Sequence, residues 1–163
     1  MTGAAWQALV MELSVLAGAE AIRPEQDMRP YTTMRVGGKA DLLVEVITED
    51  HLSRLLRFLS SQNVPHVVMG NGSNLIVADE GYHGVVLHIG SAMSAITVLE
   101  DGLEAQAGAS LAAVAQVALR HGMAGLAFAS GIPGSLGGAV AMNAGAYGRE
   151  MKDVVLTTRC LDQ

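Results

Sequence analysis

The stretch SGIPGSLGGAVAMNAGAYG, residues 130–148, decides how the rest of this chain is interpreted. It holds six glycines, three of them between Gly134 and Gly138, and no charged side chain. Glycine costs about 1 kcal/mol relative to alanine inside a helix, so the stretch makes a poor ordinary helix. Bare backbone lets consecutive N–H groups gather around an anion, and a short helix beginning near Ser135 would add donors. We therefore expect a phosphate-bearing ligand along this loop, with a tightly packed small-residue crossover as the alternative.

A second glycine-rich loop, GNGSNL at residues 70–75, directly follows a short predicted strand at residues 66–69. It is not a Walker A loop, because no Lys-Ser/Thr pair follows, and Leu75 occupies the third glycine position of G-x-G-x-x-G. Its two glycines expose N–H groups, while Ser73 and Asn74 add side chains that form hydrogen bonds. A phosphate contact is the functional interpretation, and a plain β-turn would satisfy the same composition.

The composition limits the classes of partner. The chain has 163 residues, is 50% hydrophobic and carries a formal net charge of −6, which argues against nonspecific nucleic-acid binding. No apolar run reaches the roughly 18 residues of a membrane span, and no secretory signal is visible. A single cysteine, Cys160, excludes an internal disulfide and suits a reducing compartment. The five histidines show no metal-ligand spacing, so we expect no metal. From the charge, the lack of a long apolar run and the single cysteine we expect no nucleic-acid partner, no membrane and a cytoplasmic location.

Hydrophobic spacing predicts the elements of the first half. Residues 4–19 carry apolar side chains at helical intervals. The polar segment with Pro24 and Pro30 is expected to be a loop, and residues 40–47 form a buried strand. Thr48 is expected to cap a second helix with a leucine-rich face.

The second half is predicted in the same way. A turn at residues 79–84 precedes a strand at 85–89, and the Asp-Gly pair at 101–102 indicates a hairpin. Ser110 is expected to cap a helix that Gly122 ends. Residues 154–161, VVLTTRCL, have the composition of a strand.

The segment YTTMRVGGKA, residues 31–40, supplies two threonine hydroxyls, the fixed cation of Arg35 and a Gly-Gly bend. Judged alone, it is better explained as the entrance to a strand with a solvated arginine.

Four pieces in this order and spacing resemble the flavin-binding domain of the UDP-N-acetylenolpyruvoylglucosamine reductase (MurB) family. They are residues 31–41, 70–87, 110–121 and 131–148. The resemblance implies an α+β fold, a two-lobed FAD-binding domain of the vanillyl-alcohol-oxidase/PCMH type, over residues 31–163, with residues 1–30 as an N-terminal helix and lead-in. It implies FAD between the lobes, NADPH as the reductant, and a bacterial cytoplasmic enzyme that makes UDP-N-acetylmuramate for peptidoglycan precursor synthesis.

The resemblance also implies a set of cofactor-binding residues. They are Tyr31, Thr33, Arg35, Gly70, Asn71, Gly72, Ser73, Asn74, Leu75, Ile132, Pro133, Gly134, Ser135, Gly137, Gly138, Asn143, Gly145, Tyr147 and Gly148.

The chain departs from the family pattern after Gly148. Family members carry a further substrate domain, with the catalytic arginine some thirty residues beyond the tyrosine that matches Tyr147. Arg159 is too close to Tyr147 to match it. We therefore expect no catalytic residue in this chain, no binding of the UDP-sugar substrate without the missing domain, and no turnover by the chain alone.

Three other hypotheses for the function remain open at this point. The chain could be the FAD domain of another oxidoreductase of the same fold, a non-catalytic module for another dinucleotide, or a structural domain without a ligand. A comparison of NADPH use with oxygen reactivity in the full-length parent tests the first hypothesis. The visible absorption of the purified protein distinguishes the other two from a flavoprotein.

Overall fold

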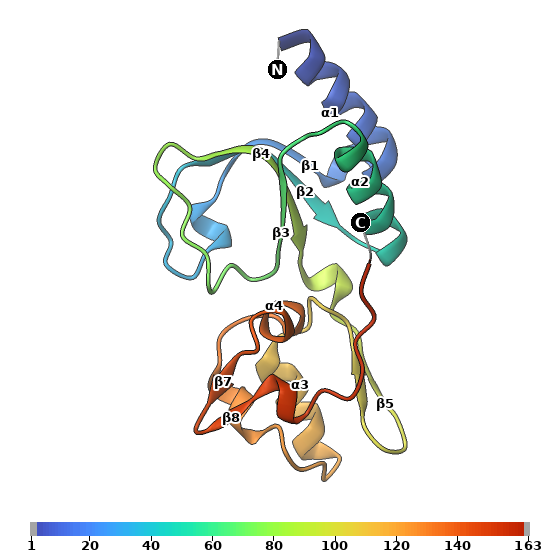
Figure 1. Ribbon diagram of the computed structural model, residues 1–163, viewed down its shortest axis with the longest axis vertical. Helices are drawn as coiled ribbons and strands as arrows, with labels where there is room; N and C mark the ends of the chain where they lie inside the picture. Colours follow the sequence, from blue (N-terminus) through green and yellow to red (C-terminus); the bar gives the residue numbers. More distant parts are fainter. Residues whose placement is uncertain (1–2, 162–163) are drawn as a thin grey trace.

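The computed structural model describes residues 3–161 as two lobes (Figure 1). Within these residues the first lobe, residues 3–90, is a four-stranded sheet with two α-helices and two short 3-10 helices. The second lobe, residues 91–161, contains two further α-helices and two small hairpins. No helix in the described part of the chain is long and apolar enough to cross a membrane.

The sheet of the first lobe has the strand order β1-β2-β4-β3. β1 runs antiparallel to β2, whereas β2 and β3 both run parallel to β4. The parallel β2 and β3 are connected through α2, which Thr48 caps as predicted by accepting the N–H of His51. The bounds are α1 Gly3–Ala17, β1 Ile22–Asp27, β2 Lys39–Val46, α2 Glu49–Ser61, β3 His66–Met69 and β4 Tyr82–Ile89.

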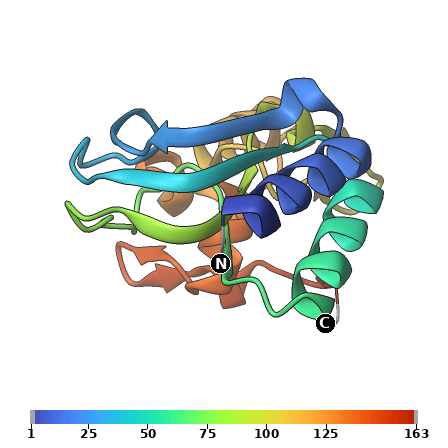
Figure 2. The same ribbon diagram turned by 90° about the horizontal axis from the view of Figure 1, so that it is seen from above.

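The two faces of the sheet are packed differently. One face is covered by α1 and α2, which lie side by side (Figure 2), and buries Leu13, Leu55 and Leu59 against the strands. The other face carries a smaller cluster around Met28 and Leu43. Because side chains alternate along a strand, Glu45 and His88 lie on this second face together with Leu43 and Val86.

Two predictions in the first lobe were wrong. The polar segment expected to be a loop contains β1, and β4 begins at Tyr82, inside the predicted turn. β1 is an edge strand with half of its residues exposed and one buried, so it lacks the apolar alternation of a buried strand. Pro24 is tolerated there because an edge strand can lack one ladder donor.

The second lobe has its own small core of Leu111, Phe128, Ala129, Ala139 and Met151. The predicted hairpin and the Ser110 cap are both confirmed, the latter by the Ala113 N–H donating to Ser110 Oγ at 3.2 Å. The bounds in this lobe are β5 Ile96–Val98, β6 Leu103–Ala105, α3 Leu111–Arg120, α4 Leu136–Ala141, β7 Gly145–Ala146 and β8 Arg149–Glu150. Short 3-10 helices are labelled η: η1 Ala19–Ala21 and η2 Arg29–Tyr31 in the first lobe, and η3 Ser91–Met93, η4 Ala127–Gly131 and η5 Met151–Asp153 in the second.

The strand predicted over residues 154–161 is not formed. Residues 155–161 have no regular secondary structure, and Leu156 is 84% exposed. β-Branched residues favour a strand only where a neighbouring edge offers hydrogen bonds and a packing surface. No strand of the described chain pairs with this segment.

The chain crosses from the first lobe to the second at Gly90, and backbone contacts fix the crossing. The Met93 N–H donates to Gly90 O (3.2 Å), and the Gly108 N–H donates to Met93 O (2.8 Å). A Cβ on Gly108 would lie 2.2 Å from Gly90 O, so the chain after β6 packs directly on the crossing. Residues 155–161 lead back to the first lobe, where Arg159 pairs with Glu49 at 2.5 Å.

Candidate cofactor site

The two glycine-rich loops of the sequence meet between the lobes. A Cβ on Gly70 would come within 2.0 Å of Ser135 Oγ, and a Cβ on Gly134 within 2.8 Å of Ser73 Oγ. Gly134 also has φ +137°, a backbone conformation that other residues rarely adopt. These glycines are therefore required for the close approach of the two loops.

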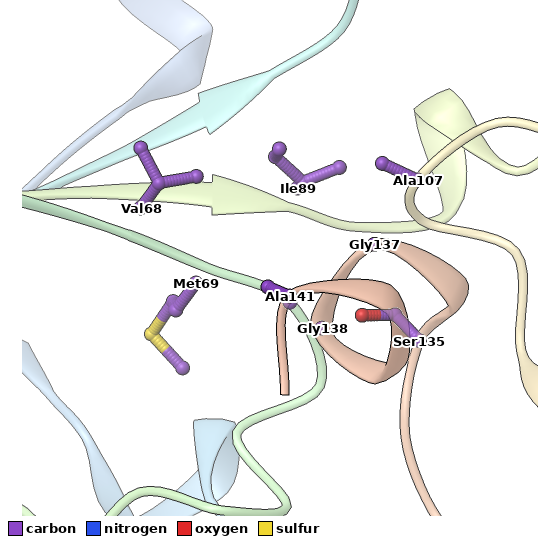
Figure 3. Close-up of a pocket in the computed structure, with 9 residues that line it drawn as sticks. Val68, Met69, Ile89, Ala107, Ser135, Gly137, Gly138 and Ala141 are labelled. Atoms are coloured by element: carbon purple, nitrogen blue, oxygen red, sulfur yellow. The ribbon is translucent and has the colours of Figure 1, made fainter. Parts of the chain in front are cut away.

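A cavity of about 270 Å³ lies where the loops meet, at the carboxyl ends of β3 and β4. Figure 3 shows strand residues on one side and the first turns of α4 on the other. The nine lining residues carry no charge, so the cavity would hold an anion through backbone dipoles rather than through side-chain cations. They are Val68, Met69, Gly70, Ile89, Ala107, Ser135, Gly137, Gly138 and Ala141.

The helix α4 begins after Ser135 as predicted, but its first donors are partly occupied. The Leu136 N–H donates to Ala109 O (2.7 Å), and the Gly137 N–H donates to Ala107 O (2.8 Å). A bridge between Ser110 and Ser135 brings these carbonyls against the helix start. The start of α4 therefore adds fewer unpaired donors than a helix N-terminus alone would offer.

Other backbone donors beside the cavity remain available. Within residues 3–161, the N–H groups of Ser135 and Gly138 form no hydrogen bond, and the same holds for the N–H groups of residues 71–74. Gly72 is buried, has φ +59°, and would place a Cβ 2.1 Å from Tyr31 O. The loop thus presents a run of unbonded amides that fits the diphosphate of a dinucleotide.

The segment after η2 packs on this loop. The Thr33 N–H donates to Gly72 O at 3.2 Å, and the Gly38 N–H donates to Ala78 O at 2.8 Å. Arg35 is exposed with φ +53° and forms no ion pair within the described residues. Tyr31 turns its ring to the sheet, where burial and then the charge of Glu45 raise the pKa of its hydroxyl.

Four of the predicted site residues lie elsewhere, on the hairpin of β7 and β8. Tyr147 and Gly148 have φ +54° and +77°, the positive values that a type I′ hairpin turn requires. Asn143 donates from Nδ2 to Glu150 Oε2 (2.8 Å) and accepts the N–H of Lys152 (3.0 Å). The composition of Asn143, Gly145, Tyr147 and Gly148 is thus explained by the hairpin, and none of them lines the cavity.

The remaining predicted residues are divided between the cavity lining and its surroundings. Ile132, Pro133, Asn74 and Leu75 do not line the cavity, whereas Gly70, Ser135, Gly137 and Gly138 do. Sequence reasoning missed the apolar part of the lining, which comes from Val68, Met69, Ile89, Ala107 and Ala141. The available signal was position, because ligands of open parallel sheets bind beyond the carboxyl ends of the strands.

Comparison with known proteins supports the two-lobed architecture. The chain is similar to the crystal structure of MurB from Thermus caldophilus, with a TM-score of 0.64 and 40% identity over 81% of this chain and 46% of that chain. It also shares its fold with p-cresol methylhydroxylase, with a TM-score of 0.57 and 12% identity over 76% of this chain and 26% of that chain. The predicted fold class is therefore confirmed.

Proteins of related sequence support the same family assignment. The chain is 38% identical over 156 residues to the UDP-N-acetylenolpyruvoylglucosamine reductase of Clostridioides difficile (strain 630), covering 96% of this chain and 51% of the relative. It is 46% identical over 138 residues to the enzyme of the same name from Caldanaerobacter subterraneus subsp. tengcongensis, covering 85% and 45%. The chain thus spans about half the length of these relatives, and the predicted resemblance is confirmed. A family model described as an FAD binding domain matches residues 40–163, and the chain belongs to this FAD-binding domain family.

Proposed function

We propose that this chain is the FAD-binding part of an NADPH-dependent UDP-N-acetylenolpyruvoylglucosamine reductase, which forms UDP-N-acetylmuramate for peptidoglycan synthesis. The observation that carries the proposal is the meeting of two glycine-rich loops, with unbonded amides at residues 71–74 and at Ser135 and Gly138. The similarity to reductases of this name, at 38–46% identity in the two relatives above, supports it. The bacterial cytoplasm, where NADPH and nucleotide sugars are available, is the proposed location.

The residues of this chain would hold and orient the cofactor. The N–H groups of residues 71–74 would bind the diphosphate, and Gly70 and Gly134 allow the two loops to lie close enough together to share it. Thr33 and Arg35 belong to the segment that packs on the same loop, and Arg35 offers a charge to a phosphate. Bound FAD supplies the hydride chemistry, while the protein supplies position and electrostatics.

The substrate-side chemistry is assigned to the half of the relatives that this chain does not span. Protonating a carbon beside the enolpyruvyl carboxylate needs a positioned acid. Apart from the hydroxyl of Ser135, the cavity lining consists of glycine and apolar side chains, with no carboxyl, imidazole or amino group. The UDP-sugar is accordingly proposed to bind only together with the second half, and the chain alone is proposed to be inactive.

Titration of the 163-residue chain with FAD and with FMN tests the proposal. Quenching of flavin fluorescence should show tighter binding of FAD, because the loops would contact the diphosphate and the adenosine beyond it. Equal affinity for the two flavins would contradict the diphosphate contact. Failure to bind either flavin would leave two hypotheses, a structural domain without a ligand or a module for another dinucleotide.

A further inference from the structure

A histidine–carboxylate pair connects β2 and β4 on the sheet face opposite the helices. Glu45 and His88 are direct Cα partners in the ladder. Their side chains meet at 2.7 Å between His88 Nδ1 and Glu45 Oε2, and they are 16% and 29% exposed for His88 and Glu45 respectively. An ionised carboxylate can only accept, so Nδ1 carries the proton of this hydrogen bond and the orientation of the imidazole is set.

The same pair holds Tyr31. The ring of Tyr31 meets the His88 ring in an edge contact, with centroids 5.1 Å apart and an interplanar angle of 87°. The Tyr31 hydroxyl donates to Glu45 Oε1 at 3.4 Å. One carboxylate therefore contacts both rings, one with each of its oxygens.

Tyr31 is continuous with the backbone that covers the amide loop. A Cβ on Gly72 would lie only 2.1 Å from the carbonyl oxygen of Tyr31. Two residues later the Thr33 N–H donates to Gly72 O. The position of the Tyr31 ring therefore determines how residues 31–33 lie on the loop at 71–74.

We propose that Glu45 and His88 are positioning residues for the cofactor: they fix Tyr31, and through it they fix the amide loop around Gly72 in its diphosphate-binding arrangement. The inference rests on the proposed function. Neither side chain lines the cavity, so their effect on the cofactor is transmitted through Tyr31 rather than through direct contact.

The chain contains a matched control pair. His83 and Asp41 also join β4 to β2, with 3.3 Å between His83 Nδ1 and Asp41 Oδ1, but their side chains are 82% and 41% exposed and no tyrosine packs on them in the described chain. They lie near the other end of the same two strands. Asp41→Asn and His83→Phe therefore repeat the chemical change at a place without a connection to Gly72.

The experiment measures FAD dissociation constants, thermal midpoints of the apo chain and amide hydrogen exchange over residues 29–38 and 71–74. Glu45→Gln and His88→Phe should raise the FAD dissociation constant roughly tenfold, as expected for a lost hydrogen bond to a charged group. Amide exchange in both segments should speed up. The control variants should match the wild type in FAD affinity and in amide exchange. Tyr31→Phe combined with Glu45→Gln should bind no more weakly than Glu45→Gln alone, because the two changes remove the same contact.

Three results would overturn the proposal. Equal FAD affinity in Glu45→Gln and Asp41→Asn, with a wild type that binds FAD, refutes the positioning role and leaves the proposed function intact. A loss of affinity in Glu45→Gln that is matched by a lower thermal midpoint, with unchanged exchange at residues 71–74, assigns the pair to general stability instead. A wild type that does not bind FAD refutes the proposed function, and the inference fails with it.

Discussion

Gly70→Ala places a single methyl group at the contact between the lobes. The new Cβ would lie 2.0 Å from Ser135 Oγ and 3.0 Å from Ser135 Cβ. Rotation of the serine hydroxyl relieves the first contact, but the second still requires a shift of a few tenths of an ångström. Ser135 is only 3% exposed, so its surroundings resist that shift.

Overpacking of this kind costs about 1–3 kcal/mol. For a chain of this size each kcal/mol lowers the thermal midpoint by about 2–4 °C, which gives a total of about 2–12 °C. Separating the loops should also weaken FAD binding by about 1.4 kcal/mol, or tenfold in Kd. Differential scanning fluorimetry and flavin titration measure the two quantities on the same protein.

Ser135→Gly provides the reciprocal change. It removes the atoms that the new methyl group meets, and replacing an N-cap residue by glycine costs only a few tenths of a kcal/mol. The double variant should therefore recover most of the lost stability and affinity. Gly131→Ala, at the end of η4 with open space around its Cβ, is the neutral control. A Gly70→Ala protein that equals the wild type, or a double variant that is additive, would refute the packing argument.

Four further predictions concern other parts of the molecule. Gly72→Val should lower both apo stability and FAD affinity, because its Cβ meets the backbone oxygen of Tyr31 at φ +59°; unfolding curves with and without FAD check this, and a purely FAD-linked loss would contradict the contact. Hydrogen bonds from Arg29 lower the pKa of Asp27 to about 2. The ionised Asp27 therefore stabilises the fold fully above its unfolded pKa, and this contribution should disappear as the pH falls from about 4 to 2. Asp27→Asn should make stability less dependent on pH in that window, as measured by acid unfolding. Asn143→Ala should loosen the β7–β8 hairpin by about 1 kcal/mol while leaving FAD affinity within twofold of the wild type, and a large affinity loss would return Asn143 to the cofactor site. The FAD-loaded chain supplied anaerobically with NADPH and the enolpyruvyl UDP-sugar should form no lactyl ether product, and turnover near that of a full-length relative would disprove the division of labour between the halves.

Local rules predicted much of the fold and the position of the site. The caps at Thr48 and Ser110, the Asp-Gly hairpin and the two glycine-rich loops depend on near neighbours, and each of them is found where the sequence places it. β1 was missed because an edge strand with exposed side chains has the same composition as a polar loop. Residues 154–161 were assigned as a strand on propensity alone, although a strand also needs a partner.

The rest of the site depended on tertiary contacts. The carbonyls of Ala107 and Ala109 that occupy the first donors of α4 come from a segment almost thirty residues earlier, and no local pattern announces them. His88 was one of five scattered histidines in the sequence. Only the β2–β4 register brings it opposite Glu45, and only the fold brings Tyr31 onto both.

The crossing at Gly90 bears on how quickly the cofactor is exchanged. Gly90 O accepts from Met93 and is packed against Gly108, while Arg159 holds the returning segment to α2. Two connections therefore join the lobes, the backbone contacts at Gly90 and the exposed ion pair between Arg159 and Glu49. With the lobes joined in this way, we expect association rates to be similar among loop variants. Their differences in affinity should therefore appear as differences in residence time, with a flavin that leaves Gly70→Ala faster than it leaves the parent chain.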